Sequence, residues 1–218
     1  MIRALAHSSF VDIRRRHVLI VGLFDALDRA GLRPVSAGQL HTLWYLLNAL
    51  APVWRLQPFD AALLKTDRQP YFPSIQSDLD RLVGMGMLVV TRLVPSTDQA
   101  RLQGLFALNR NFAVPVLAAM REIEEESNIL QFLDEVVQAS NRLTQTEQKV
   151  ALAKDATYGD QSVDTGNVID LGEWLAHDRG TPTAEVLEII ERVSGRSMLP
   201  AELMEIYVDH LGRRLRNG

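Results

Sequence analysis

The chain has 218 residues and 47% hydrophobic content, so it can bury a sizeable core as one large domain or two small ones. Twenty-seven acidic side chains against 23 basic ones give a net charge of −4, which excludes a protein that coats nucleic acid through bulk positive charge. The absence of cysteine excludes disulfides, iron–sulfur ligation, cysteine zinc sites and a thiolate nucleophile. The longest apolar run, residues 18–24, is far shorter than the roughly 20 residues that span a bilayer, so we expect a cytoplasmic protein with no membrane partner.

The first predicted elements are an N-terminal arm and two helices. Residues 1–12 show no steady period and favour an arm, which Arg14, Arg15 and Arg16 follow as a basic cluster. That cluster has two interpretations: the solvated start of a helix, or a contact with an acidic partner or nucleic acid. Helical spacing of the apolar residues predicts one helix from about residue 16 to a glycine cap, and a second, core helix after Ser36.

The stretch from Pro58 to Asn109 is predicted to form a helix–turn–helix with a β-hairpin wing. Its short apolar piece at residues 59–64 indicates a helix or turn. Ser74 then stands before an amphipathic segment that ends at a pair of glycines and predicts a capped helix. Two strand-like runs, residues 87–94 and 101–108, follow around a polar turn. A helix, a glycine break and a hairpin in this order are typical of a winged helix.

The charges on this helix help to distinguish DNA reading from protein docking. Its expected exposed positions include two carboxylates against one guanidinium, whereas DNA readers concentrate Arg and Lys there. We therefore interpret the module as protein-docking, with sequence-specific DNA binding as the alternative. The candidate protein-binding residues are Gln76, Asp78, Asp80, Arg81, Arg92 and Arg101. The candidate nucleic-acid-binding residues are Arg14, Arg15, Arg16, Lys65 and Arg68.

Helical patterns continue after residue 110. Pro115 suits the first turn of a helix, which the apolar spacing extends either as one long helix or as two joined near residues 127–128. Thr144 and Glu147 form a capping box that starts another helix. A helix opened by Thr181 and Pro182 places four apolar residues on one predicted inward face, namely Val186, Ile189, Ile190 and Val193.

The final predicted helix opens at Pro200. The predicted fold class is therefore mainly α with a small β-hairpin, a winged-helix-like N-terminal half followed by a helical C-terminal half. Along the chain we divide it into a winged-helix-like domain (1–110), a helical linker (111–142) and a helical C-terminal domain (143–218).

The motifs of the common catalytic and cofactor sites are missing from the sequence. It contains no G-x-x-x-x-G-K-[ST], G-x-G-x-x-G, G-x-S-x-G or H-E-x-x-H. The acidic residues 160–167 do not match a calcium loop, because the glycine comes one place late and Leu171 stands where a glutamate is needed. We therefore expect no catalytic residues, no metal site and no cofactor, and we predict that the protein is not an enzyme.

Five segments carry a family resemblance: Pro58–Asp60, Tyr71–Leu82, Asp155–Gly159, Val168–Asp170 and Tyr207–Leu211. In this order, around a winged helix and a helical linker, they resemble the small middle components of bacterial three-component ABC-ATPase systems. The small subunit of Lamassu-type antiphage defence is one of these.

The resemblance implies a non-catalytic adaptor for antiphage or anti-plasmid defence. Such a subunit would bind an SMC-like ABC ATPase, join it to an effector such as a nuclease, and meet DNA only through the assembled complex. Its winged helix would be similar in use to the kleisin-interacting winged-helix proteins of bacterial condensins. The alternative is a winged-helix transcription regulator or a SocA-like antitoxin, from whose pattern the C-terminal third of this chain departs.

Overall fold

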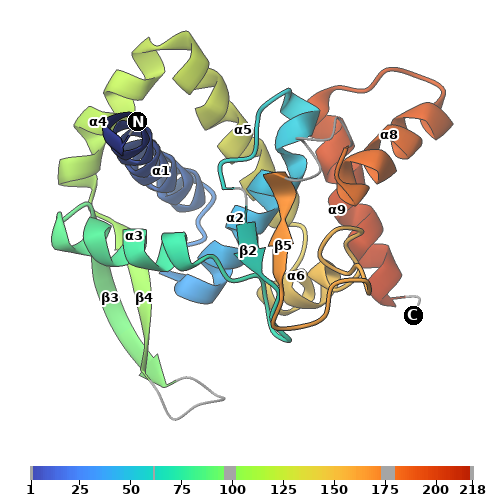
Figure 1. Cartoon of the computed structure of the whole chain (residues 1–218), viewed down its shortest axis with the longest axis horizontal. Helices are drawn as coiled ribbons and strands as arrows, with labels where there is room; N and C mark the ends of the chain where they lie inside the picture. The colour runs from blue at the N-terminus through green and yellow to red at the C-terminus, as the bar shows by residue number, and fades with distance from the viewer. Residues whose placement is uncertain (1, 61, 96–101, 173–179, 217–218) are drawn as a thin grey trace. The chain divides into compact units, whose positions relative to one another are not determined.

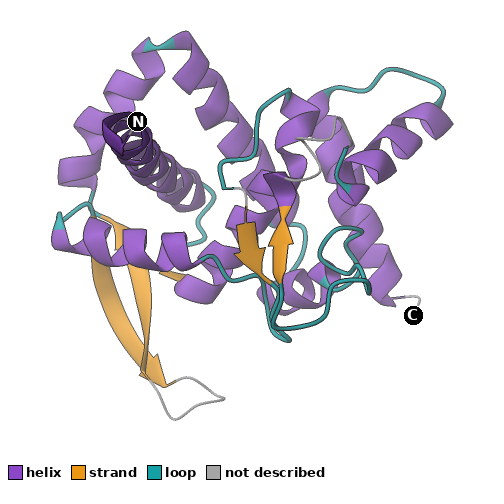
Figure 2. Ribbon diagram, in the orientation of Figure 1, coloured by secondary structure: helices purple, strands orange, loops and turns teal. Residues whose placement is uncertain are grey.

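The structure is a computed structural model that describes residues 2–60, 62–95, 102–172 and 180–216. Helices dominate it, with short antiparallel strands, which confirms the predicted fold class, mainly α with a small β-hairpin (Figure 2). The helical elements are α1 (Ile2–Arg29), α2 (Ala37–Leu50), the 3₁₀ helix η1 (Ala51–Trp54), α3 (Pro73–Gly84), α4 (Arg110–Glu122), α5 (Glu124–Ser140), α6 (Gln145–Leu152), α8 (Pro182–Ser194) and α9 (Pro200–Arg216) (Figure 1). The strands are β1 (Val35–Ser36), β2 (Ala62–Leu64), β3 (Leu88–Pro95), β4 (Leu102–Leu108) and β5 (Val168–Asp170).

The chain folds into two compact units that alternate along the sequence. Residues 1–37 and 73–134 form the first unit, and residues 38–72 and 135–218 form the second. This division differs from the three consecutive domains suggested by the sequence. The segment 38–72 belongs with the C-terminal half of the chain instead of with the hairpin.

Helix α1 is the longest element of the first unit. It begins at Ile2, so the predicted arm over residues 1–12 is wrong. Once a helix has nucleated, each further residue adds a backbone hydrogen bond at little cost, so a segment without a clear apolar period can still extend it. A Cβ on Gly22 would lie only 2.9 Å from the side chain of Leu130 and 3.0 Å from that of Leu133, so the glycine allows α1 and α5 to pack closely.

The sheet of the first unit has the strand order β1-β4-β3, all antiparallel. Val35 in β1 pairs with Phe106 in β4, so the short strand before α2 extends the hairpin into a three-stranded sheet. Along the chain the elements run α1, β1, α2, η1, β2, α3, β3, β4. A helix followed by a hairpin is present as expected, but α3 is the one helix among the described residues of 58–109, so the helix–turn–helix predicted within that stretch is wrong. The segment before α3 packs with the second unit instead.

The helical segment after the hairpin is broken into two helices. Ile123 separates α4 from α5 with an extended backbone (φ −102°, ψ 118°), four residues before the expected junction at 127–128. Pro115 lies inside α4 and not in its first turn, because the backbone N–H groups of Phe112 and Ala113 already bond to the carbonyl of Asn109 (3.1 and 3.0 Å). The predicted start of this helix was therefore too late.

Helix α2 is the core element of the second unit, since its residues from Gly38 to Leu50 are all buried. The helix is apolar around most of its circumference, as buried helices are. Residues 59–64 do not form the helix or turn expected from the sequence. Their last part is strand β2, which pairs antiparallel with β5, a strand about a hundred residues further on (Leu63 opposite Ile169). Local pattern could not reveal a partner so distant in sequence.

A buried carboxylate, Asp155, joins the helices of the second unit. It is 2% exposed, and its oxygens accept hydrogen bonds from the hydroxyls of Tyr45 on α2 and Tyr207 on α9. The hydroxyl of Thr183 on α8 donates to the same group at 3.0 Å. The backbone N–H groups of Thr157 and Tyr158 supply two more bonds, at 2.9 and 2.8 Å. Five donor groups therefore replace water around one negative charge.

The rest of the segment 155–159 is structural too. The Thr157 hydroxyl lies 2.8 Å from that of Thr183, and the Tyr158 hydroxyl donates to the carbonyl of Thr66 at 2.8 Å. A Cβ on Gly159 would fall 2.5 Å from the carbonyl oxygen of Ala153, so this position has no room for a side chain. The residues that carry the family resemblance here thus form a buried junction.

Alkaline pH is expected to unfold the second unit. Burial, followed by the negative charge of Asp155, raises the pKa of both Tyr45 and Tyr207. The folded chain therefore keeps both phenolic protons, whereas the unfolded chain loses them near about pH 10. The stability that these groups contribute is full below about pH 10 and is lost as the pH rises above it.

This pH dependence can be followed by circular dichroism and phenolate absorbance during an alkaline titration. We expect phenolate formation at these two tyrosines to coincide with unfolding. In the single variants Tyr45→Phe and Tyr207→Phe, each of which leaves four donors on Asp155, the phenolate absorbance that appears with unfolding should be smaller than in the wild type. Ionisation of both tyrosines in a chain that stays folded would contradict the buried arrangement.

Candidate protein-docking surface

Helix α3 is held in the first unit by one apolar face. Ile75, Leu79 and Leu82 are buried on it, as the spacing predicted. Asp78 lies on the same face and is 0% exposed, so its assignment to an exposed docking surface is wrong. The physical reason is helical geometry, because position 78 follows Ile75 by three residues and precedes Leu82 by four.

Three cationic or polar side chains surround the buried carboxylate of Asp78. Arg16 of α1 donates to it from Nε, and Nε2 of His17 lies 2.9 Å from its other oxygen. Arg81, one turn further along α3, donates from 3.3 Å. The carboxylate thus ties α3 to α1. Arg16 serves this contact, so it does not stand free as part of the nucleic-acid-binding cluster suggested by the sequence.

The outer side of α3 keeps Gln76, Asp80 and Arg81 at least partly exposed. The amide of Gln76 donates to Asp80 at a long 3.4 Å, and Arg81 is the cation already paired with Asp78. With Asp78 inside, one carboxylate and one guanidinium remain on this side. The outer face of α3 is therefore nearly neutral, without the concentration of Arg and Lys that phosphate contacts require.

The hairpin is clamped where it leaves α3. Gly86 adopts a left-handed conformation (φ 73°) in the turn between α3 and β3. The side-chain amide of Asn109, just beyond β4, donates to the Gly86 carbonyl at 2.9 Å, and its backbone N–H donates to Met87 at 2.9 Å. Both ends of the hairpin are thus fixed at one point, and the hairpin extends from there as the wing of the first unit (Figure 1).

One face of the wing starts in the core and ends in solvent. Cross-strand pairs put Val90 opposite Phe106, and Leu93 opposite Gly104. Residues two apart on a strand share a face, so these side chains and Leu102 lie on the face that buries Leu88 and Phe106 at its base. Further out, however, Leu93 is 59% and Leu102 68% exposed. We call Val90, Leu93 and Leu102 the wing stripe.

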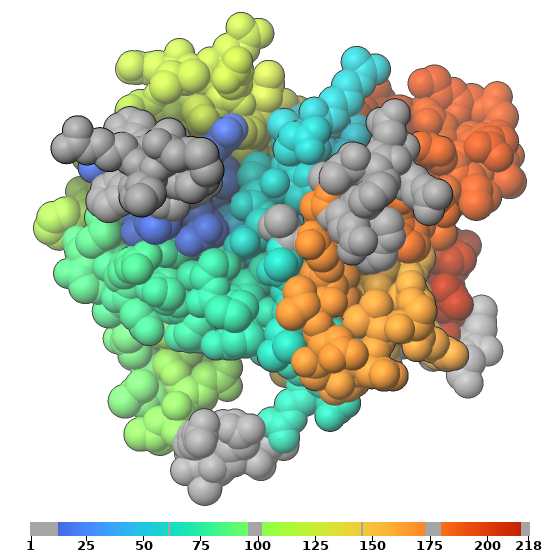
Figure 3. All heavy atoms as spheres, in the orientation of Figure 1, coloured from blue at the N-terminus to red at the C-terminus, as the bar shows by residue number. Residues whose placement is uncertain are grey.

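The other face of the wing is also exposed. It carries Val89 and Arg92, of which the valine is 40% exposed. The register shifts between Val90 and Arg92, and the intervening Thr91 donates its hydroxyl to the carbonyl of Leu105 at 3.1 Å. In the space-filling view the wing extends beyond the atoms of α3 (Figure 3). Exposed apolar side chains are therefore present on both faces of the described part of the wing.

The other predicted site residues are dispersed. Arg14 and Arg15 are exposed on α1, and Arg15 lies 3.9 Å from Glu126. Lys65 and Arg68 belong to the second unit, where Nζ of Lys65 donates to the carbonyls of Asp160 and Val163 at 2.5 and 2.8 Å. These two bonds hold Lys65 against the acidic segment 160–167, which does not match a calcium loop in sequence. Arg101 lies outside the described residues.

Further arginines of the first unit are engaged by aspartates of α1. Asp25 accepts bonds from Arg29 (3.2 Å) and Arg121 (3.1 Å), and Asp28 accepts one from Arg110 (2.7 Å). The hydrogen bonds of Arg29 to Asp134, together with the negative charges of Asp134 and Asp25, raise the pKa of Arg29. The guanidinium groups are held in place by carboxylates, which lowers their availability to a phosphate backbone. None of these arginines was identified as a site residue from the sequence.

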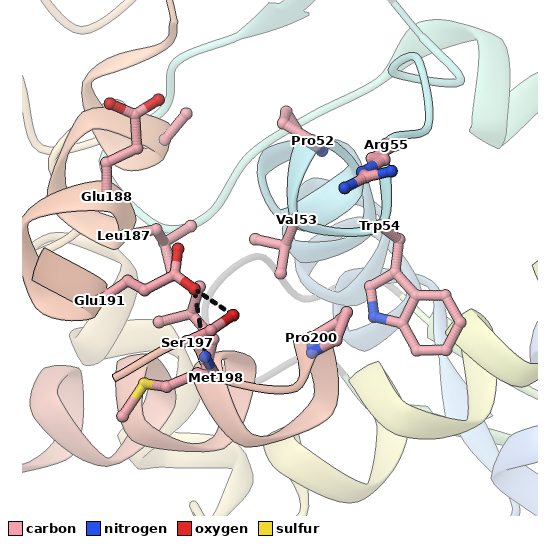
Figure 4. Close-up of a pocket in the computed structure, with 12 residues that line it drawn as sticks. Pro52, Val53, Trp54, Arg55, Leu187, Glu188, Glu191, Ser197, Met198 and Pro200 are labelled. Atoms are coloured by element: carbon pink, nitrogen blue, oxygen red, sulfur yellow. Dashed lines mark hydrogen bonds between the residues drawn. The ribbon is translucent and has the colours of Figure 1, made fainter. Parts of the chain in front are cut away.

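The second unit contains a pocket of about 440 Å³ between η1, α8 and the start of α9. Its apolar lining includes Leu187 and Leu203, and the charged side chains of Arg55 and Glu188 lie on opposite sides of it (Figure 4). Glu191 reaches across and accepts a hydrogen bond from the Met198 N–H at 3.1 Å. The lining residues come from two segments, 52–55 and 184–203, that lie far apart in the sequence. No local sequence pattern therefore predicted the pocket.

Within the part of the chain that the structure describes, no group of three His, Cys, Asp or Glu side chains could hold a metal ion. No helix there has the length and apolar character needed to cross a membrane. Comparison with protein-family models, with curated proteins and with solved structures finds no match. The proposed function therefore rests on the exposed surfaces of the described residues.

Removing the buried charge should loosen α3. In Asp78→Asn the neutral amide leaves the buried guanidinium of Arg16 without its carboxylate, so we expect the free energy of unfolding of the first unit to fall by about 3 kcal/mol. Chemical denaturation followed by circular dichroism measures the change. The matched variant Asp80→Asn, on the exposed side of the same helix, should change stability by less than about 0.5 kcal/mol. Equal effects at the two positions would show that Asp78 is not the link between the helices.

Proposed function

We propose that this protein is a non-catalytic interaction subunit that docks on another polypeptide through its wing. The observation that supports the proposal is the wing stripe. Val90, Leu93 and Leu102 continue the core face of the sheet into solvent, where no helix among the described residues of the first unit buries them. A monomeric protein gains nothing from such a surface, whereas a subunit of an assembly buries it on binding.

The wing stripe can contribute a substantial free energy of association for so small a surface. Burying a leucine side chain that was fully exposed is worth about 1.5–3 kcal/mol. Leu93 and Leu102 are each more than half exposed before binding, so each can contribute on the order of 1 kcal/mol to association. Residues at the centre of such a patch commonly dominate an interface. Gln76, Asp80, Arg81 and Arg92 would supply the polar surroundings.

The sequence resemblance suggests which polypeptide is bound. It points to an SMC-like ABC ATPase in a cytoplasmic antiphage or anti-plasmid defence complex, which the subunit would link to an effector such as a nuclease. DNA would then be contacted by the assembled complex. The exposed wing supports this proposal by offering a surface on which a partner polypeptide can dock.

Winged-helix element order also favours a second candidate, a DNA-binding transcription regulator or antitoxin. In that case Arg14, Arg15 and Arg92, which are exposed on the first unit, would contact phosphate. A shift assay with operator-length duplex at two salt concentrations separates the candidates. Each phosphate contact makes DNA binding fall steeply with salt. Tight, salt-sensitive binding by the isolated chain would favour the regulator.

The docking proposal predicts that polar substitutions on the wing stripe abolish complex formation without unfolding the chain. We expect the double variant Leu93→Ser, Leu102→Ser to lose copurification with an SMC-like ATPase encoded by a neighbouring gene. Its thermal unfolding should stay close to that of the wild type, because both side chains are already exposed. Co-expression followed by affinity purification measures the effect.

A matched control is available in the second unit. Val150 on α6 is 49% exposed, so Val150→Ser removes an exposed apolar side chain of similar kind away from the wing. The control should copurify like the wild type. If the wing variant still forms the complex, or if no neighbouring ATPase binds the wild-type chain, the proposal is wrong.

A further inference from the structure

The pocket between η1, α8 and the start of α9 carries two opposite charges that are not paired with each other. Arg55 follows η1 directly, Glu188 lies on α8, and the two side chains stand on opposite sides of the pocket (Figure 4). Both residues are exposed, and neither forms an ion pair with another described residue. Arg142 and Arg196 of the same unit, in contrast, are each paired with a carboxylate. The pocket therefore offers a guanidinium and a carboxylate to a ligand.

Arg55 occupies a backbone position that favours glycine. It closes η1 in a left-handed conformation (φ 56°, ψ 29°), and it is the one non-glycine residue with positive φ in the part of the chain that the structure describes. Its N–H donates to the Pro52 carbonyl at 2.9 Å, and the Leu56 N–H donates to the Ala51 carbonyl at 3.0 Å. A helix end of this kind usually carries glycine, because a Cβ makes the left-handed conformation costly. Residues held in such conformations are common at binding sites, so the backbone gives Arg55 a functional interpretation.

The two glutamates that α8 contributes to the pocket have different surroundings. Glu191 accepts hydrogen bonds from the Met198 N–H at 3.1 Å and from the Ser197 hydroxyl at 3.5 Å, so it holds the turn between α8 and α9. Glu188 lies one turn earlier on the same side of the helix and makes no such bond within the described residues. Glu191 is thus a supporting group, and Glu188 is the carboxylate that a ligand can reach.

The lining between the two charges is apolar. Leu187 of α8 and Leu203 of α9 are buried beneath it. Further apolar side chains line the pocket, namely Pro52, Val53, Met198 and Pro200. Its volume of about 440 Å³ lies in the range of ligand sites, which combine an apolar lining with a few polar groups that fix orientation. The pocket can therefore hold the apolar part of a ligand whose charged groups reach Arg55 and Glu188.

The positions of the two charges indicate the chemistry of that ligand. A carboxylate alone would bind Arg55 but leave Glu188 without a partner, and a cation alone would do the reverse, so the pocket is complementary to a ligand with both charges. A free amino acid carries its carboxylate and ammonium on one carbon atom, whereas Arg55 and Glu188 lie on opposite sides of the pocket. The C-terminal end of a polypeptide can separate the two charges, with its terminal carboxylate at one end and a Lys or Arg side chain upstream.

We propose that this pocket binds the C-terminal end of a partner polypeptide. The terminal carboxylate would accept hydrogen bonds from Arg55, the last apolar side chains would contact Leu187 and Leu203, and a basic side chain upstream would face Glu188. This inference deepens the proposed function by giving the second unit a peptide site of its own. It rests on the proposed function only in that the chain binds polypeptides, since the wing stripe belongs to the first unit.

The probe for this site is a peptide that ends in Gly-Gly-Lys-Leu-Leu with a free carboxylate and carries a fluorescent label on its N-terminus. One comparison peptide has a C-terminal amide, and a second has glutamine in place of lysine. Fluorescence anisotropy measures binding to the full chain. We expect the amide to raise the Kd at least about tenfold, because Arg55 loses its carboxylate partner. The glutamine peptide should bind about threefold more weakly, since an exposed ion pair contributes less.

Competition distinguishes a polypeptide end from a free amino acid. The unlabelled peptide acetyl-Lys-Leu-Leu should displace the probe, whereas free leucine at the same concentration should leave it bound. Equal displacement by leucine would assign the pocket to a free amino acid and overturn the proposal.

Variants of Arg55 test the guanidinium without disturbing the fold. Arg55→Gly should raise the Kd for the probe at least about tenfold, and it should keep the wild-type unfolding transition because glycine adopts the left-handed conformation readily. Arg55→Lys keeps the charge but not the two parallel hydrogen bonds of a guanidinium, so its Kd should lie between those of the wild type and the glycine variant. Arg213→Ala is the matched control, because this exposed arginine on α9 does not line the pocket. It should bind the probe as the wild type does.

Variants of Glu188 test the other charge. Glu188→Gln should weaken binding of the lysine probe about threefold and leave the Kd of the glutamine peptide unchanged, because the two changes remove the same ion pair. Glu185→Gln is the matched control, since Glu185 is exposed on α8 and does not line the pocket. This control should bind both peptides as the wild type does.

Three further results would overturn the inference: no binding of the probe, equal binding of the amidated peptide, or an unchanged Kd in Arg55→Gly. The wing variant Leu93→Ser, Leu102→Ser should bind the probe normally. Failure of the ATPase to copurify would refute the proposed function and leave this peptide experiment to decide the pocket separately.

Discussion

The organisation of the first unit depends on one buried carboxylate. Asp78 sits on the apolar face of α3 and receives hydrogen bonds from Arg16 on α1, which fixes the helix from which the wing extends. A buried charge of this kind adds little net stability when it is fully paired, but it penalises any other arrangement of the helices strongly. The same logic holds in the second unit, where the donors around Asp155 fix α2, α8 and α9.

This anchoring has a consequence for the surfaces that remain. Because α3 is held by specific polar contacts, turning it would break the bonds that Arg16 and His17 make with Asp78. The wing stripe that extends from it is exposed in the folded chain, and exposed apolar surface favours association with other polypeptides. The outer face of α3 is nearly neutral and gives little attraction to phosphate, which is why we propose protein docking ahead of DNA reading.

Local sequence signals were sufficient for much of the fold. The amphipathic spacing after Ser74, the capping box of Thr144 and the proline openings of α8 and α9 all predicted helices that the structure contains. Ser74 itself lies inside α3, which begins at Pro73, so its predicted place before the helix is wrong. Features that depend on distant partners could not be predicted from local sequence. Strand β2 pairs with a strand about a hundred residues further on, and the two units alternate along the chain. The burial of Asp78 was recoverable, since its spacing from Ile75 and Leu82 places it on the core face. The orientation of α8 was only partly recoverable. Val186, Ile189, Ile190 and Val193 were all predicted to face inward, but Ile189 and Val193 are exposed, because the contact of Thr183 with Asp155 turns the other edge of the apolar arc toward the core.

Hydrogen–deuterium exchange of the full chain with and without its partner tests the central claim most directly. If the wing is the docking surface, backbone amides of β3 and β4 should exchange more slowly in the complex with an SMC-like ATPase, while operator-length DNA alone should leave them unchanged. Slower exchange of the wing and of α3 with DNA, and none with the ATPase, would contradict the account and identify the module as a DNA reader.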